Sequence, residues 1–131
     1  MAKKKVTLSV AIATYNEVIK LEACLASVVS WVDEIVLVDG GSTDGTLEIA
    51  KKYGANISKR DNPAMFHINK QYAIDACKSD WILQLDADEV ISPKLRAEIL
   101  SVIKKKNTNA GYQMPRKNFF IGKWLSKGGQ Y

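Results

Sequence analysis

The sequence predicts an α/β fold with three layers, in which helices cover both faces of a mostly parallel central sheet. Apolar, β-branched runs alternate along the chain with amphipathic segments of helical period, an order typical of parallel strands joined by right-handed crossovers. The runs are continuously apolar, so both faces of the sheet are expected to be buried. The expected strands are residues 6–13, 34–39, 55–60 and 80–91, with a further strand near 110–114.

Capping signals indicate where the helices begin and end. Thr14 and Glu17 have the spacing of a capping box, which predicts that the first helix begins there. Gly54 predicts the end of a helix over residues 46–53. A third helix is expected over residues 66–77, and Ser92 followed by a proline predicts the start of the fourth.

Length and composition indicate one ordinary globular domain. The chain has 131 residues, of which 47% are hydrophobic and 25% charged, enough for a single core. Its net charge of +5 suits an anionic partner, either a phosphorylated substrate or an anionic membrane surface, although a solubilising lysine surface explains it equally well. A nucleic-acid partner is not expected, because no base-reading module accompanies the lysines.

The cysteines and the N-terminus favour a cytoplasmic protein. Cys24 and Cys77 lack the spacing of a metal site or a redox motif and are interpreted as reduced, partly buried thiols. The basic residues of the N-terminus precede no apolar leader segment, and no apolar run is long enough to span a membrane. The expected location is the cytoplasm, with peripheral association at the inner face of the membrane as an option.

An apolar strand that ends in acid is the most unusual stretch of the chain. Residues 80–91 run from large apolar side chains directly into Asp86, Ala87 and Asp88. In an extended strand, side chains two residues apart point the same way, so the two carboxylates are expected to converge while the small alanine leaves room beside them. Carboxylate oxygens favour Mg²⁺ or Mn²⁺. The alternative is that these acids only cap the following segment in solvent.

Signatures of three phosphate-binding classes can be tested at the expected strand ends. A dinucleotide site needs a glycine-rich turn after the first strand, and residues 13–18 contain no glycine. A P-loop needs a lysine after its last glycine, whereas Gly45 is followed by threonine. A receiver domain needs paired acids after the first strand, where this chain has Thr14 and Tyr15. All three classes are disfavoured.

Three motifs in order resemble those of the family 2 glycosyltransferases, which have the GT-A fold of nucleotide-diphospho-sugar transferases. The motifs are Ala-Thr-Tyr-Asn-Glu (13–17), Val-Asp-Gly-Gly-Ser-Thr-Asp-Gly-Thr (38–46) and Leu-Asp-Ala-Asp-Glu (85–89). A further stretch, 116–124, resembles the bacterial subgroup that includes lipopolysaccharide core glucosyltransferases. The resemblance implies a nucleotide-binding core over residues 1–106 and the start of an acceptor-side region over 107–131, within a single domain.

The resemblance also implies roles for individual residues. Thr14, Tyr15 and Glu17 would line the nucleoside pocket, and Asp39 would accept a hydrogen bond from the base, usually uracil. Gly40 departs from the acid or serine common at that position and would leave the pocket more open. The remaining implied site residues are Lys70 near the diphosphate, Asp86 at the ribose or near the metal, Ala87 beside it, and Asp88 as a direct ligand of Mg²⁺ or Mn²⁺.

Several polar residues have a plainer explanation that stays open. Asp44 is expected to cap the helix from residue 46 rather than to contact a ligand, and Glu89 is either a helix-entry acid or a support for the metal site. His67 is interpreted as a surface or capping residue, and Trp81 as a core residue rather than a platform for a sugar. Lys70 has a surface role as its alternative.

The resemblance implies an inverting transferase that passes a sugar from a nucleotide-diphosphate sugar, in the first instance a UDP-sugar, to a cell-envelope glycan or lipid. Such a reaction needs a carboxylate base to deprotonate the acceptor hydroxyl. No convincing base follows Val90: Glu98 lies on an expected helix, and 107–131 contains no Asp or Glu. The chain is therefore expected to be a donor-binding part, inactive in transfer and prone to self-association through 107–131. The alternative is a sugar-nucleotide-binding module without catalysis; a nucleotidyltransferase is disfavoured.

Overall fold

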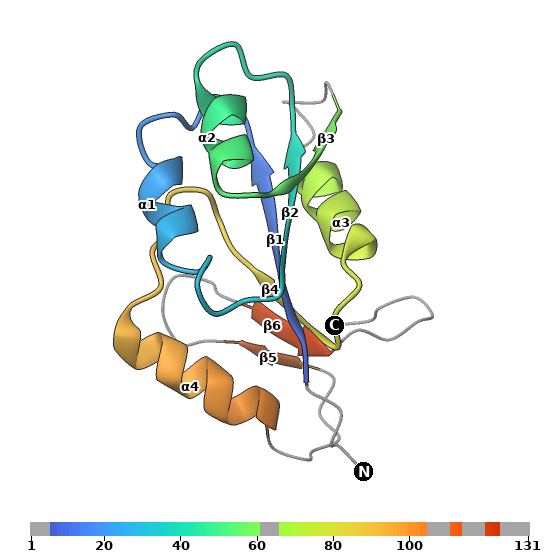
Figure 1. The fold of residues 1–131 in the computed structure, drawn as a ribbon. Coiled ribbons are helices and arrows are strands. Elements are labelled where there is room, and N and C mark those ends of the chain that lie inside the picture. Colours follow the sequence, from blue (N-terminus) through green and yellow to red (C-terminus); the bar gives the residue numbers. More distant parts are fainter. Residues whose placement is uncertain (1–5, 61–65, 105–110, 114–119, 124–131) are drawn as a thin grey trace.

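The structure, a computed structural model, describes residues 6–60, 66–104, 111–113 and 120–123, and it has the predicted α/β architecture (Figure 1). Strands and helices alternate through the first eight elements, and two short strands follow. In chain order the elements are β1 (Leu8–Thr14), α1 (Leu21–Ala26), β2 (Glu34–Asp39), α2 (Thr46–Lys52), β3 (Asn56–Lys59), α3 (Phe66–Ala76), β4 (Trp81–Gln84), α4 (Pro93–Lys104), β5 (Gly111–Gln113) and β6 (Phe120–Lys123).

The strands form one sheet in the order β3-β2-β1-β4-β6-β5. The first four are mutually parallel, and β6 pairs antiparallel with both β4 and β5. Register brings Thr14 opposite Asp39, and Asp39 opposite Lys59. The carboxyl ends of β1, β2 and β3 therefore meet at one edge of the sheet, where ligands bind in folds of this kind.

Each face of the sheet has its own apolar core. On one face, side chains of β1, β2 and β4 pack with α1, α2 and α4, and Leu8, Leu25, Leu83 and Ile99 are among the fully buried members. On the other face, alternate side chains of the same strands pack with α3. This two-sided burial confirms the three layers predicted from the continuously apolar strands.

The predicted helix start at Thr14 is wrong. Thr14 is the last residue of β1, and its hydroxyl donates to Asp39 Oδ1 at 2.7 Å, a charge-assisted hydrogen bond to the end of β2. The Glu17 N–H instead donates to Thr46 Oγ1 at 2.9 Å, so no capping box forms. Residues 15–20 are turns, and α1 begins only at Leu21.

The expected strand over 80–91 is also too long. β4 ends at Gln84, and the chain turns at 86–89: the Glu89 N–H donates to Asp86 O at 3.0 Å, while Glu89 Oε1 accepts from the Asp86 N–H at 3.1 Å. The argument that Asp86 and Asp88 share one side of an extended strand therefore fails. Any convergence of these carboxylates depends on this turn, which we call the acidic turn.

Other sequence signals are confirmed. Gly54 follows α2 with a φ of 75°, the left-handed conformation that glycine adopts without strain. The Ser92 hydroxyl oxygen accepts from the Leu95 N–H at 3.1 Å, and α4 begins at Pro93. Trp81 is a core residue with 4% of its surface exposed.

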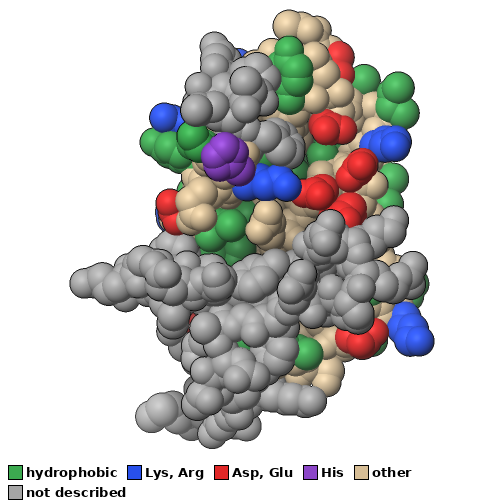
Figure 2. Space-filling view, turned by 180° about the vertical axis from the view of Figure 1, so that it is seen from behind, with side chains coloured by type: hydrophobic (Ala, Val, Ile, Leu, Met, Phe, Trp, Pro, Cys, Tyr) green, Lys and Arg blue, Asp and Glu red, His purple; other side chains and the backbone are tan. Residues whose placement is uncertain are grey.

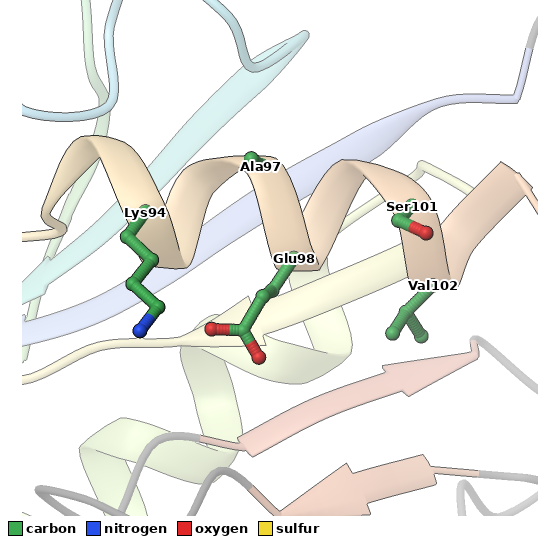
Figure 3. A pocket seen from close by; sticks show the side chains of 5 residues that line it. All are labelled: Lys94, Ala97, Glu98, Ser101 and Val102. Carbon is green, nitrogen blue, oxygen red and sulfur yellow. The ribbon is translucent and has the colours of Figure 1, made fainter.

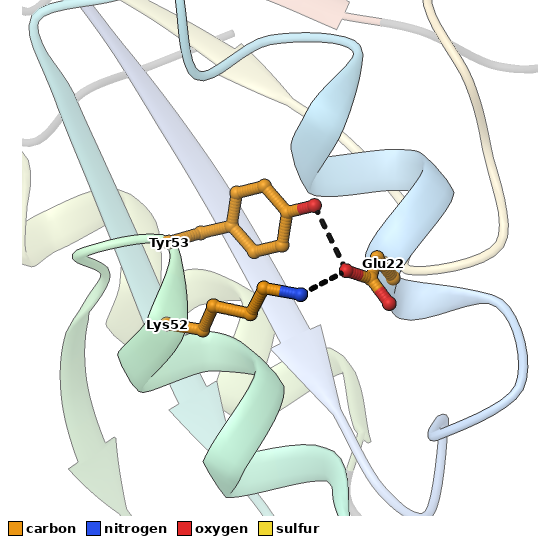
Figure 4. Close-up of polar contacts among 3 residues, drawn as sticks. All are labelled: Glu22, Lys52 and Tyr53. Atoms are coloured by element: carbon orange, nitrogen blue, oxygen red, sulfur yellow. Dashed lines mark hydrogen bonds and ion pairs between the residues drawn. The ribbon is translucent and has the colours of Figure 1, made fainter.

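A surface contact joins α1 to the C-terminal end of α2. Glu22 Oε2 accepts hydrogen bonds from Lys52 Nζ at 2.7 Å and from the Tyr53 hydroxyl at 3.0 Å (Figure 4). The hydrogen bond from Lys52 holds the pKa of Glu22 below its usual value. Because the group is solvent-exposed, the contact orients the two helices more than it stabilises them.

Both cysteines are free and buried. Burial raises the pKa of Cys24 and of Cys77 to about 12, so both thiols are protonated at neutral pH. They are more deeply buried than the sequence suggested. Among the helices of the described chain, none has the length and apolar character that a membrane span requires.

Candidate functional site

Hydrogen bonds connect the loop that follows β1 to the loop that follows β2. Asn16 contributes two of them: its N–H donates to Ser42 Oγ at 2.7 Å, and its Oδ1 accepts from the Thr43 N–H at 2.8 Å. The Gly40 N–H donates to Thr14 O at 2.9 Å, beside the Thr14–Asp39 hydrogen bond. The two loops thus form a single rigid unit at the carboxyl edge of the sheet, with Tyr15, 40% exposed, between its anchored neighbours.

Asn16 has a backbone φ of 52°, which makes it the one residue other than glycine with a positive φ in the described chain. Asparagine tolerates this left-handed conformation better than most residues. The conformation lets both its N–H and its side chain face the β2–α2 loop. The sequence alone did not single out Asn16 and Ser42 as site residues; the asparagine two residues after the end of β1 is the signal for the turn.

Asp39 lies at the centre of this unit. Its Oδ2 accepts from the N–H groups of Gly41 (3.0 Å) and Ser42 (2.7 Å), and its Oδ1 accepts from the hydroxyls of Thr14 (2.7 Å) and Ser42 (2.6 Å). Burial opposes ionisation, but the hydrogen bonds from Ser42, Thr14 and Gly41 outweigh it and hold the pKa of Asp39 below its usual value. The carboxylate is therefore charged at neutral pH although the residue is buried.

Lys70 and Asp86, both predicted site residues, are brought together by the fold. Lys70 Nζ lies 2.9 Å from Asp86 Oδ1, and both side chains retain exposed surface. This ion pair connects α3, on one face of the sheet, to the acidic turn after β4. A cation and carboxylates at a shared edge can bind a diphosphate together with a divalent ion.

Asp86 is one of four neighbouring carboxylates. We call these four, Glu17, Asp44, Asp86 and Asp88, the acidic cluster. Burial, followed by the charge of Asp88, raises the pKa of Glu17; Asp44 and Asp86 act in the same direction, and Lys20 opposes them. Figure 2 shows acidic side chains gathered on one face of the molecule, next to a basic side chain. Mutual repulsion in such a group is relieved by a bound cation.

Two hydrogen bonds with neighbouring side chains hold the acidic turn in place. The Cys24 thiol donates to Asp86 O at 3.6 Å, and Glu89 is 8% exposed and closes the turn through its hydrogen bond with the Asp86 N–H. Glu89 is therefore not a helix-entry acid, since α4 begins at Pro93. Ala87 is 3% exposed and packs in the core below the turn, so its side chain does not line the space beside the carboxylates.

The donor set at the acidic cluster fits Mg²⁺ or Mn²⁺. Asp88 is exposed and Asp86 partly so, and both offer the oxygen ligands that these ions prefer. Within residues 6–60, 66–104, 111–113 and 120–123, no group of three or more His, Cys, Asp or Glu side chains is arranged to hold a metal by itself. Mg²⁺ usually takes one or two protein carboxylates and completes its shell with phosphates and water, so Asp86 and Asp88 would hold it only together with such ligands.

Other singled-out residues have structural roles or lie on the surface. Asp44 Oδ1 accepts from the Thr46 N–H at 2.9 Å just before α2, but the N-cap residue of α2 is Gly45, so Asp44 is not the cap that was expected. His67 is exposed on α3. Glu98 lines an open pocket at α4 with Lys94, Ala97, Ser101 and Val102 (Figure 3). None of these lining residues is a predicted site residue.

The sequence that forms these loops matches a known family. The model of glycosyl transferase family 2 matches residues 9–127, which include all three motifs. The chain belongs to glycosyltransferase family 2. A similar protein is an uncharacterized glycosyltransferase of Rickettsia bellii, 38% identical over 101 residues, which are 76% of this chain and 34% of that protein.

One further relative and one solved structure are informative. Lipopolysaccharide core biosynthesis glycosyltransferase LpsC of Rhizobium meliloti is 32% identical over 122 residues, 90% of this chain and 45% of LpsC. Glucosyl-3-phosphoglycerate synthase of Mycobacterium tuberculosis, solved with Mn²⁺, UDP and phosphoglyceric acid, has the same fold, with a TM-score of 0.64 and 18% identity over 90% of this chain and 56% of that one. The chain spans about a third of the length of the Rickettsia protein and just under half of that of LpsC. The GT-A fold expected from the motifs is confirmed.

Proposed function

We propose that this chain binds a nucleotide-diphosphate sugar, a UDP-sugar in the first instance, at the carboxyl edge of its sheet, and that it serves sugar transfer. The observation that carries the proposal is the Lys70–Asp86 ion pair at 2.9 Å, because it places a cation and the acidic turn at one edge. Family membership supports the same reaction class. The UDP and Mn²⁺ bound to the mycobacterial synthase support the choice of donor and ion.

In this proposal the nucleoside lies against the hydrogen-bonded loops that follow β1 and β2. Asp39 accepts a hydrogen bond from the imide N–H of uracil, which suits a carboxylate that is ionised and acceptor-only. Thr14, Tyr15 and Glu17 border the nucleoside, and Tyr15 is exposed enough to contact it. A loop held by its own hydrogen bonds costs little further ordering when the nucleotide binds.

The diphosphate then lies at the acidic turn. Asp88, with Asp86 beside it, would hold Mg²⁺ or Mn²⁺, which when bound neutralises charge on the departing diphosphate. Lys70 contributes a fixed positive charge at the same place, so part of the stabilisation of the leaving group belongs to the chain itself. Attack by the acceptor from the opposite side of the sugar carbon would invert its configuration.

We further propose that the acceptor is a glycan or lipid of the cell envelope, reached at the cytoplasmic face of the membrane. The likeness to LpsC, which is named for lipopolysaccharide core biosynthesis, supports this choice. The net charge of +5 suits an anionic acceptor or surface.

A second candidate is a sugar-nucleotide-binding module that does not transfer the sugar. It is favoured by the position of Glu98, the one acid between Val90 and Lys104, which lies in the α4 pocket with no predicted site residue. The described chain then supplies the donor site and no separate base.

The test of donor binding is calorimetric titration with UDP-glucose, UDP, UMP and inorganic diphosphate in the presence of Mn²⁺. The proposal predicts that UDP binds more tightly than UMP, since the second phosphate reaches Lys70 and the metal. Equal binding of UDP and UMP would contradict it. An assay for transfer of labelled sugar to acceptors in envelope extracts then distinguishes a transferase from a binding module, because only a transferase makes labelled product.

A further inference from the structure

Asp39 has no free acceptor position in this structure. A carboxylate has about four lone-pair sites, and Asp39 receives four hydrogen bonds, two on each oxygen, from Thr14, Gly41 and Ser42. The residue also has 0% exposed surface. A nucleobase that reads this carboxylate must therefore replace one of its present donors.

The four donors differ in how easily they can leave. The N–H groups of Gly41 and Ser42 belong to the loop backbone and hold Oδ2 from one side. The Thr14 hydroxyl is fully buried between β1 and β2, in register with Asp39. The Ser42 side chain is only partly buried, and rotation about one bond moves its hydroxyl away from Oδ1.

Movement of the Ser42 hydroxyl away from Asp39 also leaves no buried polar group of the loops without a hydrogen-bond partner. Ser42 Oγ accepts from the Asn16 N–H, and Asn16 is exposed, so water can take over that hydrogen bond. By contrast, removal of the Thr14 hydroxyl would leave a buried polar group without a partner, which is costly.

The geometry points to Ser42 as the residue whose hydroxyl occupies the base-reading position of Asp39 in the free protein and yields it to the imide N–H of the nucleobase. This inference rests on the proposed function, in which Asp39 reads the base. It assigns to Ser42 a role in specificity: the hydroxyl competes with any base, and only a base with an N–H donor can replace the hydrogen bond that it gives up. A base without that donor leaves Ser42 in place.

The test compares UDP with 3-methyl-UDP, in which the imide N–H is replaced by a methyl group. Calorimetric titrations are run on the parent chain, on Ser42→Ala, which removes the competitor, and on Ser42→Thr, which keeps a hydroxyl. Asn16→Gly is the matched control, because glycine tolerates the positive φ and keeps the N–H to Ser42 but loses the contact with Thr43. Thermal unfolding confirms that each variant is folded.

We expect Ser42→Ala to bind UDP about three- to tenfold more tightly than the parent, the scale of one hydrogen bond to a charged group reduced by the loss of the Asn16 contact. Ser42→Ala should show no gain in affinity for 3-methyl-UDP. Ser42→Thr and Asn16→Gly should show no gain in affinity for UDP. Unchanged or weaker UDP binding by Ser42→Ala, or an equal gain for both nucleotides, would overturn the inference. If the parent does not distinguish the two nucleotides, the proposed role of Asp39 fails, and the role of Ser42 fails with it.

Discussion

The Lys70 Nζ atom lies 2.9 Å from Asp86 Oδ1, which ties a helix on one face of the sheet to the acidic turn at its carboxyl edge. Lys70 lies on α3, and Asp86 follows β4, the next element of the chain, which lies beside β1 in the sheet. With Asp86 engaged by Lys70, Asp88 is the exposed acid of the turn that remains best suited to hold a cation. In the proposed site, Lys70 therefore supplies a positive charge, and Asp88 is the residue proposed to bind the divalent ion.

Lys70→Met should weaken UDP binding about tenfold and leave uridine binding unchanged, because the lost cation faces the diphosphate and not the base. The free energy of unfolding should change by less than about 1 kcal/mol, since the ion pair is partly exposed. Calorimetry and urea unfolding measure the two effects. Lys51→Met, an exposed lysine of α2, is the control; an equal loss of UDP affinity in both variants would make the effect one of general charge.

The sequence predicted the β-α order, the three layers and the segments that meet at the site, because continuous apolar runs and strand-end polar residues follow directly from parallel-sheet geometry. It did not predict β6, a short strand in a region of mixed aromatics and lysines without a clear period. It also placed the first helix too early: Thr14 can cap a helix or bond a neighbouring strand, and only the tertiary contact with Asp39 decides.

The same limit applies within the site. Period-two geometry predicts Asp86 and Asp88 on one side of a strand, but the hydrogen bond between the Asp86 N–H and Glu89 closes a turn there. Asn16 and Ser42 were passed over because their importance comes from hydrogen bonds between two loops, which no spacing along one segment shows. The individual roles of the site residues stay predictions.

Asp39→Asn should make the protein less stable at neutral pH, by about 1–3 kcal/mol, because an amide cannot accept all four hydrogen bonds that the carboxylate receives. The variant should also bind UDP more weakly, by about 1.5–3 kcal/mol. Urea unfolding and calorimetry check both. Asp75→Asn, at an exposed position on α3, should change stability by less than about 0.5 kcal/mol.

Asp39 should also contribute to acid unfolding. Its folded-state pKa lies below the unfolded value of about 3.9, so the ionised group stabilises the fold above that pH. The stabilisation is lost as the pH falls through the folded-state pKa. Parent stability measured between about pH 6 and about pH 3 should fall more steeply than that of Asp39→Asn; parallel curves would show that Asp39 does not couple ionisation to folding.

Ser92→Ala should lower the free energy of unfolding by about 1 kcal/mol, because the hydroxyl oxygen caps the Leu95 N–H at the start of α4. Ser101→Ala, at an exposed position inside the same helix, should be neutral or slightly stabilising, since alanine has the higher helix propensity. Thermal unfolding of the two variants side by side is the measurement. A similar loss in both would mean that the cap makes no specific contribution.

The central claim, a metal-assisted nucleotide-diphosphate site at the acidic turn, is tested most directly by the affinity for UDP with Mn²⁺ and with a chelator. We predict that the parent binds UDP more tightly with Mn²⁺ and that Asp88→Ala loses most of this difference, because the ion bridges the carboxylate and the diphosphate. Asp75→Ala, which changes an exposed acid of α3, should keep it. Equal affinity of the parent for UDP with Mn²⁺ and with chelator would contradict the claim.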